Sequence, residues 1–160
     1  MLLNADQVLE VLITNGKGAK AQVGYDLTLR QVKLIKGGSV MSDKTTIADY
    51  LQVNPITFAE GRREFRLIPG TYSLTFDQGI KLPTNKTAFI RHRSSILRCG
   101  SVITSGIFDS GFETDEMGAV LIVTEPITIE QGARVAQVYI FENYEAQAYD
   151  GQYQKSKDVK

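Results

Sequence analysis

The sequence is short of several residue types: its 160 residues include no tryptophan, one cysteine (Cys99) and one histidine (His92). One thiol cannot form an internal disulfide, and one thiol with one histidine cannot build a structural zinc site. Neither charge is in excess, because 18 Lys and Arg balance 18 Asp and Glu. This balance excludes the bulk basicity of a nucleic-acid coat protein. We therefore expect a protein of a reducing compartment, the cytoplasm, that binds no nucleic acid.

Long hydrophobic runs are absent as well. The longest apolar stretches, such as residues 119–123, fall far short of the roughly 20 residues that a membrane span needs. Residues 1–6 contain no basic side chain, so we expect neither a signal peptide nor a membrane partner. The sequence also lacks a Walker loop, a dinucleotide-binding glycine fingerprint and a paired-histidine metal motif.

Short β-rich segments separated by turns make up most of the chain, whose 42% apolar and 22% charged content is typical of one globular domain. Such strands at roughly 8–12-residue spacing, with no amphipathic helix between them, indicate a mainly β protein, an antiparallel sandwich or jelly roll. The predicted strands are residues 65–68, 72–76, 80–82, 87–91, 101–104, 119–124, 127–129 and 134–141.

Two helices are predicted beside these strands. The first thirteen or so residues carry an apolar stripe at three-and-four spacing, which Asn4 or Asp6 can cap. This helix should end near Asn15 and Gly16, where the chain can adopt a positive φ. A second short helix is predicted at residues 45–51.

The densest polar cluster, residues 91–98, holds three arginines and two serines. The guanidinium groups of Arg93 and Arg98 and the hydroxyls of Ser94 and Ser95 suit phosphate oxygens. The two serines could also begin a helical turn whose free amides face an anion. The alternative is a solvated charged loop or strand end, which is a common surface feature.

A second candidate site is residues 105–112, where a carboxylate lies between glycines. Asp109 follows two apolar residues, and Gly106 and Gly111 permit close approach of the backbone to a ligand. A carboxylate at the edge of an apolar pocket can orient and deprotonate a water molecule. The alternative is a turn aspartate that is hydrogen-bonded to its own backbone.

Residues 132–137 are the third candidate. Along a regular strand Arg134 and Ala136 share one face, and Val135 and Gln137 share the other. The alternative is a hairpin turn that leads into a buried strand.

Two further segments are weaker by themselves. Residues 24–27 place one acid, Asp26, between hydrophobic residues. In residues 149–154 an aromatic side chain lies close to Gly151 and could stack on a base or sugar. The alternative for this tail is a disordered end that contains two tyrosines.

Taken together and in this order, the segments resemble the motifs of the trimeric dUTPase / dCTP deaminase superfamily. The resemblance runs through residues 24–27, 93–100, 106–112 and 132–137. The beginning of the chain and its Tyr-Asp-Gly-Gln-Tyr-Gln tail look like the dCTP-deaminase-like branch. The resemblance implies a distorted antiparallel jelly-roll-like β-barrel with a short N-terminal helix. It also implies one domain at residues 1–148 and a mobile tail at 149–160 that closes the active site.

The function implied by this resemblance is dUTP diphosphatase activity, the hydrolysis of dUTP to dUMP and pyrophosphate. Asp109 would activate a water for attack on the α-phosphorus, with help from Gln137 and Ser94. Mg²⁺ would bridge the phosphates, with Asp26 at most in its outer shell through water. The resemblance further implies a homotrimer with sites at the subunit interfaces. The substrate-binding residues would be Arg93, Ser95, Arg98, Thr104, Gly106, Phe112, Arg134, Tyr149, Tyr153 and Gln154.

Other functions remain open on the same scaffold. A dCTP deaminase, alone or forming dUMP, would need a glutamate on the strand after residues 106–112, where this sequence aligns Val123. Glu125 is the outside candidate for that role if the register slips. A non-catalytic nucleotide-binding protein and a structural jelly-roll protein are the non-enzymatic alternatives.

Overall fold

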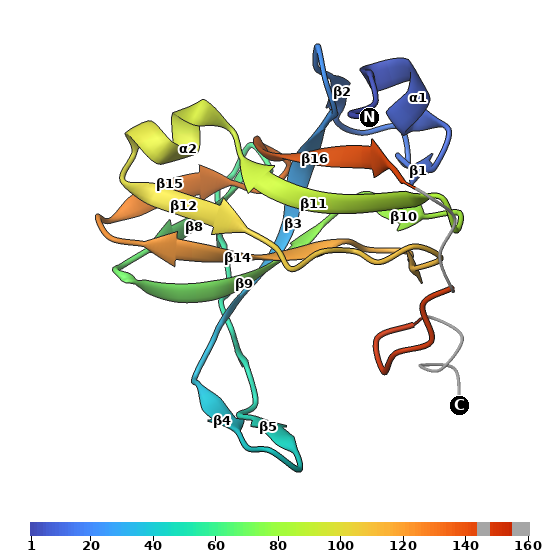
Figure 1. Ribbon diagram of the computed structural model, residues 1–160. Helices are drawn as coiled ribbons and strands as arrows, with labels where there is room; N and C mark the ends of the chain where they lie inside the picture. Colours follow the sequence, from blue (N-terminus) through green and yellow to red (C-terminus); the bar gives the residue numbers. More distant parts are fainter. Residues whose placement is uncertain (144–147, 155–160) are drawn as a thin grey trace.

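Six antiparallel strands close into a barrel in the computed structural model, which describes residues 1–143 and 148–154 (Figure 1). Around the ring the order is β16, β11, β12, β14, β9 and β3, and β3 pairs with β16 to complete it. Their bounds are β3 (Tyr25–Leu34), β9 (Gly70–Phe76), β11 (Lys86–His92), β12 (Ser101–Thr104), β14 (Gly118–Val123) and β16 (Arg134–Glu142). The prediction of a mainly β, jelly-roll-like barrel with a short N-terminal helix is confirmed.

Alternation of apolar and polar residues explains why these segments form barrel strands. In β9 the side chains of Tyr72, Leu74 and Phe76 are buried, and those between them are partly exposed. In β14, Leu121 is fully buried and lies opposite Tyr72. Because successive side chains point to opposite faces of a strand, one face of every strand fills the barrel with apolar groups.

Smaller elements surround the barrel. One three-stranded sheet comprises β1, β10 and β13, another comprises β15, β8 and β7, and β2 and β6 add to β3. Their bounds are β1 (Leu12–Ile13), β2 (Ala19–Lys20), β6 (Leu51–Gln52), β7 (Ile56–Thr57), β8 (Arg63–Leu67), β10 (Gly79–Lys81), β13 (Glu113–Thr114) and β15 (Ile127–Glu130). The helices are α1 (Ala5–Leu9) and α2 (Ser94–Arg98).

The N-terminal helix is shorter than predicted. Asn4 caps α1 as expected, because its side chain accepts a hydrogen bond of 3.0 Å from the Gln7 amide. The apolar residues Leu12 and Ile13 leave the helix and pair with β10 as β1. Tertiary pairing therefore overrides the helical stripe, and the positive-φ turn at Asn15 follows a strand rather than a helix.

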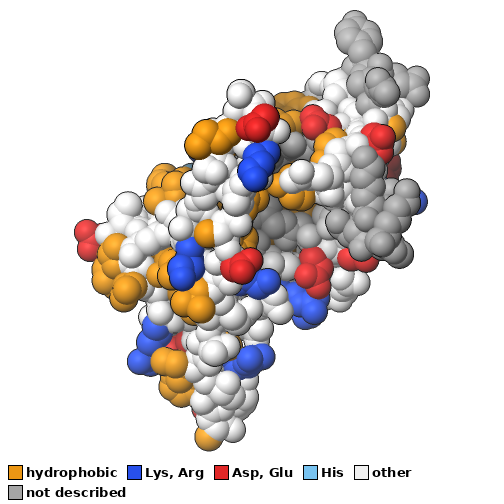
Figure 2. All heavy atoms as spheres, turned by 90° about the horizontal axis from the view of Figure 1, so that it is seen from below, with side chains coloured by type: hydrophobic (Ala, Val, Ile, Leu, Met, Phe, Trp, Pro, Cys, Tyr) orange, Lys and Arg blue, Asp and Glu red, His pale blue; other side chains and the backbone are white. Residues whose placement is uncertain are grey.

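The prediction of a helix at residues 45–51 is wrong. Its β-branched half forms β5 (Thr45–Ile47), which pairs with β4 (Gly38–Val40) in a hairpin that stands away from the barrel (Figure 1). This hairpin leaves Val40 83% exposed. Figure 2 views the molecule from below Figure 1, the side on which this hairpin lies, and shows hydrophobic side chains among charges of both signs.

The longest barrel strand, β3, begins at residues that looked unremarkable in the sequence. Gly24 precedes it with a φ of +74°, and a Cβ there would lie 2.4 Å from the Val138 carbonyl oxygen. Only glycine therefore fits, and the close approach places Asp26 opposite Gln137 in the β3–β16 pair. Within the described residues, no helix has both the length and the hydropathy to cross a membrane.

Candidate active site

The carboxylate of Asp26 joins two of the predicted site segments. Gln137 Nε2 donates to Asp26 Oδ1 over 2.8 Å, and Arg93 Nε lies 3.2 Å from Asp26 Oδ2. Arg134 Nη1 reaches the same Oδ2 over 3.3 Å. The side chain of Asp26 is 5% exposed, so burial is offset by two cations and an amide.

An irregularity in β16 brings Arg134 and Gln137 together. Regular alternation predicted that they would lie on opposite faces, but the β3–β16 register shifts between Arg134 and Ala136. The shift adds one residue to β16, so both side chains reach Asp26. The predicted assignment of faces is therefore wrong at this strand, and the bulge is the reason.

Tyr139 belongs to the same group, although the sequence analysis did not single it out. Its hydroxyl donates to Gln137 Oε1, so both ends of the Gln137 amide are engaged. Burial raises the pKa of Tyr139, and the Asp26 carboxylate raises it further. Tyr139 lies two residues after Gln137, so strand periodicity alone could have placed it on the same face.

A polar cavity of about 370 Å³ lies over this group. The lining residues are His92, Arg93, Ser94, Leu97, Gln137 and Tyr139. Ser94 begins α2, the helical turn that the two serines predicted, and buried Ile96 anchors that turn. Ser95 and Arg98 are exposed on α2 and are not among the lining residues.

Asp109 lies at a second cavity of about 600 Å³, in which four of the nine lining residues are aromatic. Its lining residues are Ser73, Gly106, Ile107, Phe108, Asp109, Phe112, Gly118, Tyr149 and Tyr153. The rings of Phe108 and Phe112 stack with centroids 5.3 Å apart, and Tyr149 meets Phe112 edge-on at 5.4 Å. Thr104 instead pairs with Val120 in the barrel sheet. This cavity has the volume and apolar lining of a small-molecule site.

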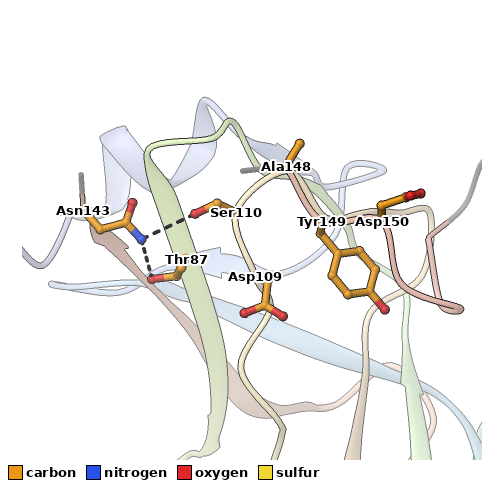
Figure 3. A pocket seen from close by; sticks show the side chains of 7 residues that line it. All are labelled: Thr87, Asp109, Ser110, Asn143, Ala148, Tyr149 and Asp150. Atoms are coloured by element: carbon orange, nitrogen blue, oxygen red, sulfur yellow. Dashed lines mark hydrogen bonds between the residues drawn. The ribbon is translucent and has the colours of Figure 1, made fainter. Parts of the chain in front are cut away.

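Asp109 also lines a neighbouring hollow of about 410 Å³, together with residues of β11, of its own loop and of the tail (Figure 3). Asn143 Nδ2 lies 3.5 Å from Thr87 Oγ1 and 3.4 Å from Ser110 Oγ at its edge. Asp109 is exposed, and in the part of the chain that the structure describes its carboxylate accepts no hydrogen bond. The turn-aspartate alternative, with the side chain bonded to its own backbone, is therefore not what these residues adopt.

The described part of the tail packs on the Asp109 loop of its own chain. The Tyr149 amide donates to the Ser110 carbonyl over 2.7 Å. Gln154 donates to the Gly111 carbonyl and accepts from the Glu113 amide, both over 2.9 Å. Residues 155–160 of the predicted tail lie outside the described residues.

The two cavities lie apart on one chain. Phe108 bridges to Ala88 near the start of β11, which places Asp109 at that end of the strand. Arg93 follows the other end of β11, and at ~3.3 Å per residue the five residues from 88 to 93 span roughly 17 Å. In Figure 1, α2 and the red tail segment accordingly lie at opposite ends of the molecule. Among described residues, no Arg or Lys lines either hollow beside Asp109.

The residues considered for a deaminase glutamate are at neither cavity. Val123 is 3% exposed and points into the barrel core. Glu125 is exposed after β14, with its Cγ beside Gly100 at the end of α2. Neither residue lines the cavities at Asp109 or at Arg93.

The donor set does not fit a resident metal ion. The described residues contain no group of three or more His, Cys, Asp and Glu side chains that could hold one. Both oxygens of Asp26 are engaged by Arg93, Arg134 and Gln137. The role of Asp26 in the outer shell of Mg²⁺ therefore has no support from this arrangement.

The chain is thus a closed antiparallel β-barrel protein with an arginine-and-serine cavity and, apart from it, a cavity lined by aromatic residues beside a carboxylate. A sequence model described as dCTP deaminase-like matches residues 5–143. The chain belongs to the dCTP deaminase-like family.

Two relatives and one solved structure illustrate this membership. A probable deoxyuridine 5'-triphosphate nucleotidohydrolase of Halobacterium salinarum is 33% identical over 136 residues, which cover 84% of this chain and 82% of the relative. The deoxyuridine 5'-triphosphate nucleotidohydrolase of Methanocaldococcus jannaschii is 31% identical over 136 residues, or 82% of this chain and 85% of the relative. The crystal structure of a dCTP deaminase from Agrobacterium tumefaciens shares the fold, with a TM-score of 0.64 and 14% identity. That match covers 87% of this chain and 47% of the deaminase chain.

Proposed function

We propose that this protein is a dUTP diphosphatase that hydrolyses dUTP to dUMP and pyrophosphate. Two relatives that are more than 30% identical over most of this chain carry that activity in their names. The observation that carries the proposal is the position of Asp109, an exposed carboxylate at the edge of an aromatic cavity with room for a nucleoside.

Asp109 acts as the general base in this proposal. It takes a proton from a water molecule while the water oxygen forms a bond to the α-phosphorus. The bond from the α-phosphorus to the oxygen bridging the α- and β-phosphates breaks, and pyrophosphate leaves with that oxygen. Gln137, whose amide is fixed by Asp26 and Tyr139, helps to orient the water.

The two cavities divide the substrate between them. The ring of Phe112 supports the deoxyribose, and backbone groups near Thr104 and Gly106 read the base. Arg93, Ser94 and Arg134 hold phosphate oxygens and stabilise the charge that develops on the leaving pyrophosphate. On α2 the exposed Arg98 adds a further guanidinium to this surface, and the exposed Ser95 adds a hydroxyl. Positioning and electrostatics of this kind supply most of the catalysis in phosphoryl transfer.

Mg²⁺ belongs to the substrate in this scheme. The ion would enter as part of the triphosphate substrate and would supply charge neutralisation there. The chain's own residues bind and orient that complex, and no described cluster of side chains holds the ion by itself.

We further propose a homotrimer in which the Asp109 cavity of one chain meets the Arg93 cavity of the next. The support is the separation of the two cavities within one chain and the lack of Arg or Lys among the described residues lining those at Asp109. The tail, through Tyr149, Tyr153 and Gln154, closes the aromatic cavity. The proposed compartment is the cytoplasm, where the exposed thiol of Cys99 stays reduced.

The test is a nucleotide panel with two readouts. Purified protein with Mg²⁺ is given each deoxynucleoside triphosphate in turn, and pyrophosphate and ammonia are measured separately. We expect pyrophosphate from dUTP, no ammonia from dCTP, and loss of turnover in Asp109→Asn with nucleotide affinity and assembly retained. Ammonia release would establish a deaminase, and dUTP binding without turnover a non-catalytic binder. Equal turnover by Asp109→Asn would remove Asp109 from the mechanism.

A further inference from the structure

We propose that Asp26 is a positioning residue that holds Arg93, Arg134 and Gln137 in the arrangement that binds polyphosphate, and that it does so without a metal ion. The inference builds on the proposed function, because it concerns how the phosphate half of that site is organised. It replaces the expectation that Asp26 meets Mg²⁺ through a water molecule.

The contacts of Asp26 come from two separate parts of the chain. Arg93 lies between β11 and α2, Arg134 begins β16, and Gln137 lies three residues further along that strand. All three meet one carboxylate at 2.8–3.3 Å. Arg93 Nη1 also donates to the Arg134 carbonyl over 3.2 Å. One acid therefore fixes the relative positions of both predicted phosphate-binding segments.

Burial leaves little room for a hydrated ion at this carboxylate. The side chain of Asp26 is 5% exposed, whereas those of Arg93 and Arg134 are 32% and 48% exposed. The carboxylate is therefore far less exposed than the two guanidinium groups that contact its Oδ2, and its Oδ1 accepts from the Gln137 amide. A hydrated ion would have to compete with these contacts to reach Asp26.

The charge balance favours an anion at the exposed side of the group. Two guanidinium groups and one carboxylate leave a net charge of +1, and each guanidinium has five N–H donors. Arg93 donates one hydrogen bond, from Nη1 to the Arg134 carbonyl, and its Nε faces Asp26 in an ion pair, so at least three of its five N–H groups are not used by these two contacts. Asp26 thus offsets the repulsion between the two cations, while donors remain for phosphate oxygens.

Tyr139 extends the same arrangement to Gln137. Its hydroxyl donates to Gln137 Oε1 while Gln137 Nε2 donates to Asp26. The amide is therefore held at both ends in one orientation. Gln137 depends on Asp26 as Arg93 and Arg134 do.

The experiment compares ligand binding with and without metal. The probe is α,β-imido-dUTP, in which an NH group replaces the oxygen of the bond to be broken, titrated calorimetrically in EDTA and again in Mg²⁺. The variant is Asp26→Asn. It removes the negative charge and places an amide N–H group among the N–H donors of Arg93, Arg134 and Gln137. The matched control is Asp77→Asn, another buried carboxylate, which pairs with Thr28 and Lys17 and lines none of the cavities beside Arg93 or Asp109.

We expect Asp26→Asn to weaken metal-free binding by about tenfold or more, the cost of one or more charge-assisted hydrogen bonds. The Mg²⁺ concentration for half-maximal dUTP hydrolysis should stay within about twofold of wild type, and Asp77→Asn should match wild type in both. Unchanged metal-free affinity with a raised Mg²⁺ requirement would overturn the inference, as would a wild-type protein that binds the probe only with Mg²⁺. Wild-type protein that binds the probe but hydrolyses no dUTP would refute the proposed function alone.

A measurement on the wild-type protein covers the case in which Asp26→Asn does not fold. The Nε–H signal of Arg93 is followed by nitrogen NMR and assigned with Arg93→Lys. It should remain in slow exchange when the Mg²⁺ complex of the probe binds, because the ion pair with Asp26 persists. Fast exchange of that proton in the complex would show that Asp26 has left the arginine for the ion.

Discussion

Mixing two inactive variants tests whether the active site is shared between chains. One variant is Asp109→Asn, and the other is Arg93→Ala, which removes the guanidinium at the polar cavity. The roughly 17 Å between residues 88 and 93 along β11 keeps Asp109 away from Arg93 on its own chain. Each variant alone should be inactive, because every site in its trimer lacks one of the two groups.

The recovered activity follows from counting sites in mixed trimers. At a 1:1 ratio with free exchange of subunits, half of the Asp109 loops and half of the Arg93 cavities are intact. If each site takes one of each from neighbouring chains, roughly one quarter of the sites are complete. The mixture should then release pyrophosphate from dUTP at about a quarter of the wild-type rate per chain.

The assay uses coexpressed chains with different affinity tags, so that mixed trimers can be purified and verified by native mass spectrometry. Purification removes the inactive homotrimers, and one site in three is complete in every mixed trimer, so the purified sample should reach about a third of the wild-type rate per chain. Wild type mixed with Asp109→Asn is the control and should retain about half of the activity per chain. Mixed trimers that stay as inactive as their parents would show that both groups act within one chain or not in one site. That result would refute the shared-site reasoning.

Three further outcomes follow from the structure. Deleting residues 149–160 should raise KM and lower kcat, because Tyr149 lines the Asp109 cavity; unchanged kinetics would make the tail a spectator. Burial raises the pKa of the Tyr25 and Tyr139 hydroxyls, so the folded state holds these protons more tightly than the unfolded chain does. The resulting stabilisation of the folded state is complete below about pH 10, the ordinary tyrosine pKa. It is lost as the pH rises through the raised pKa values of the folded state. Urea unfolding at pH 9 and pH 11 should show this loss, and it should shrink in Tyr139→Phe. Leu121→Ala should cost about 2–5 kcal/mol of unfolding free energy, whereas Ile122→Ala, at a 41% exposed position, should cost much less by the same measurement.

The strands were predictable where a short-range pattern determines them. Residues 72–76 alternate strictly, and the structure has β9 there with alternate side chains buried. Residues 45–51 failed because β5 is formed by pairing with β4, which a local apolar pattern does not report. The same holds for Leu12 and Ile13, whose partner β10 lies far along the chain.

The site was predictable in its residue types but not in its internal contacts. Asp109, Phe112 and Tyr149 lie around one cavity, as do Arg93, Ser94 and Gln137. The hydrogen bond between Gln137 and Asp26 joins residues 111 positions apart. The arrangement around it includes the bulge in β16, which cannot be predicted from the residue types in that strand. The contacts of Asp26 with Arg93, Arg134 and Gln137 could therefore not be predicted from the sequence.

Strand β3 gives the architecture one further property. Its first half pairs with β16 and its second half with β9, so detaching it would both open the ring and release Asp26. Heat or denaturant that frees this strand should abolish polyphosphate recognition in the same transition. Selection for an intact phosphate site would then also maintain the thermodynamic stability of the whole barrel.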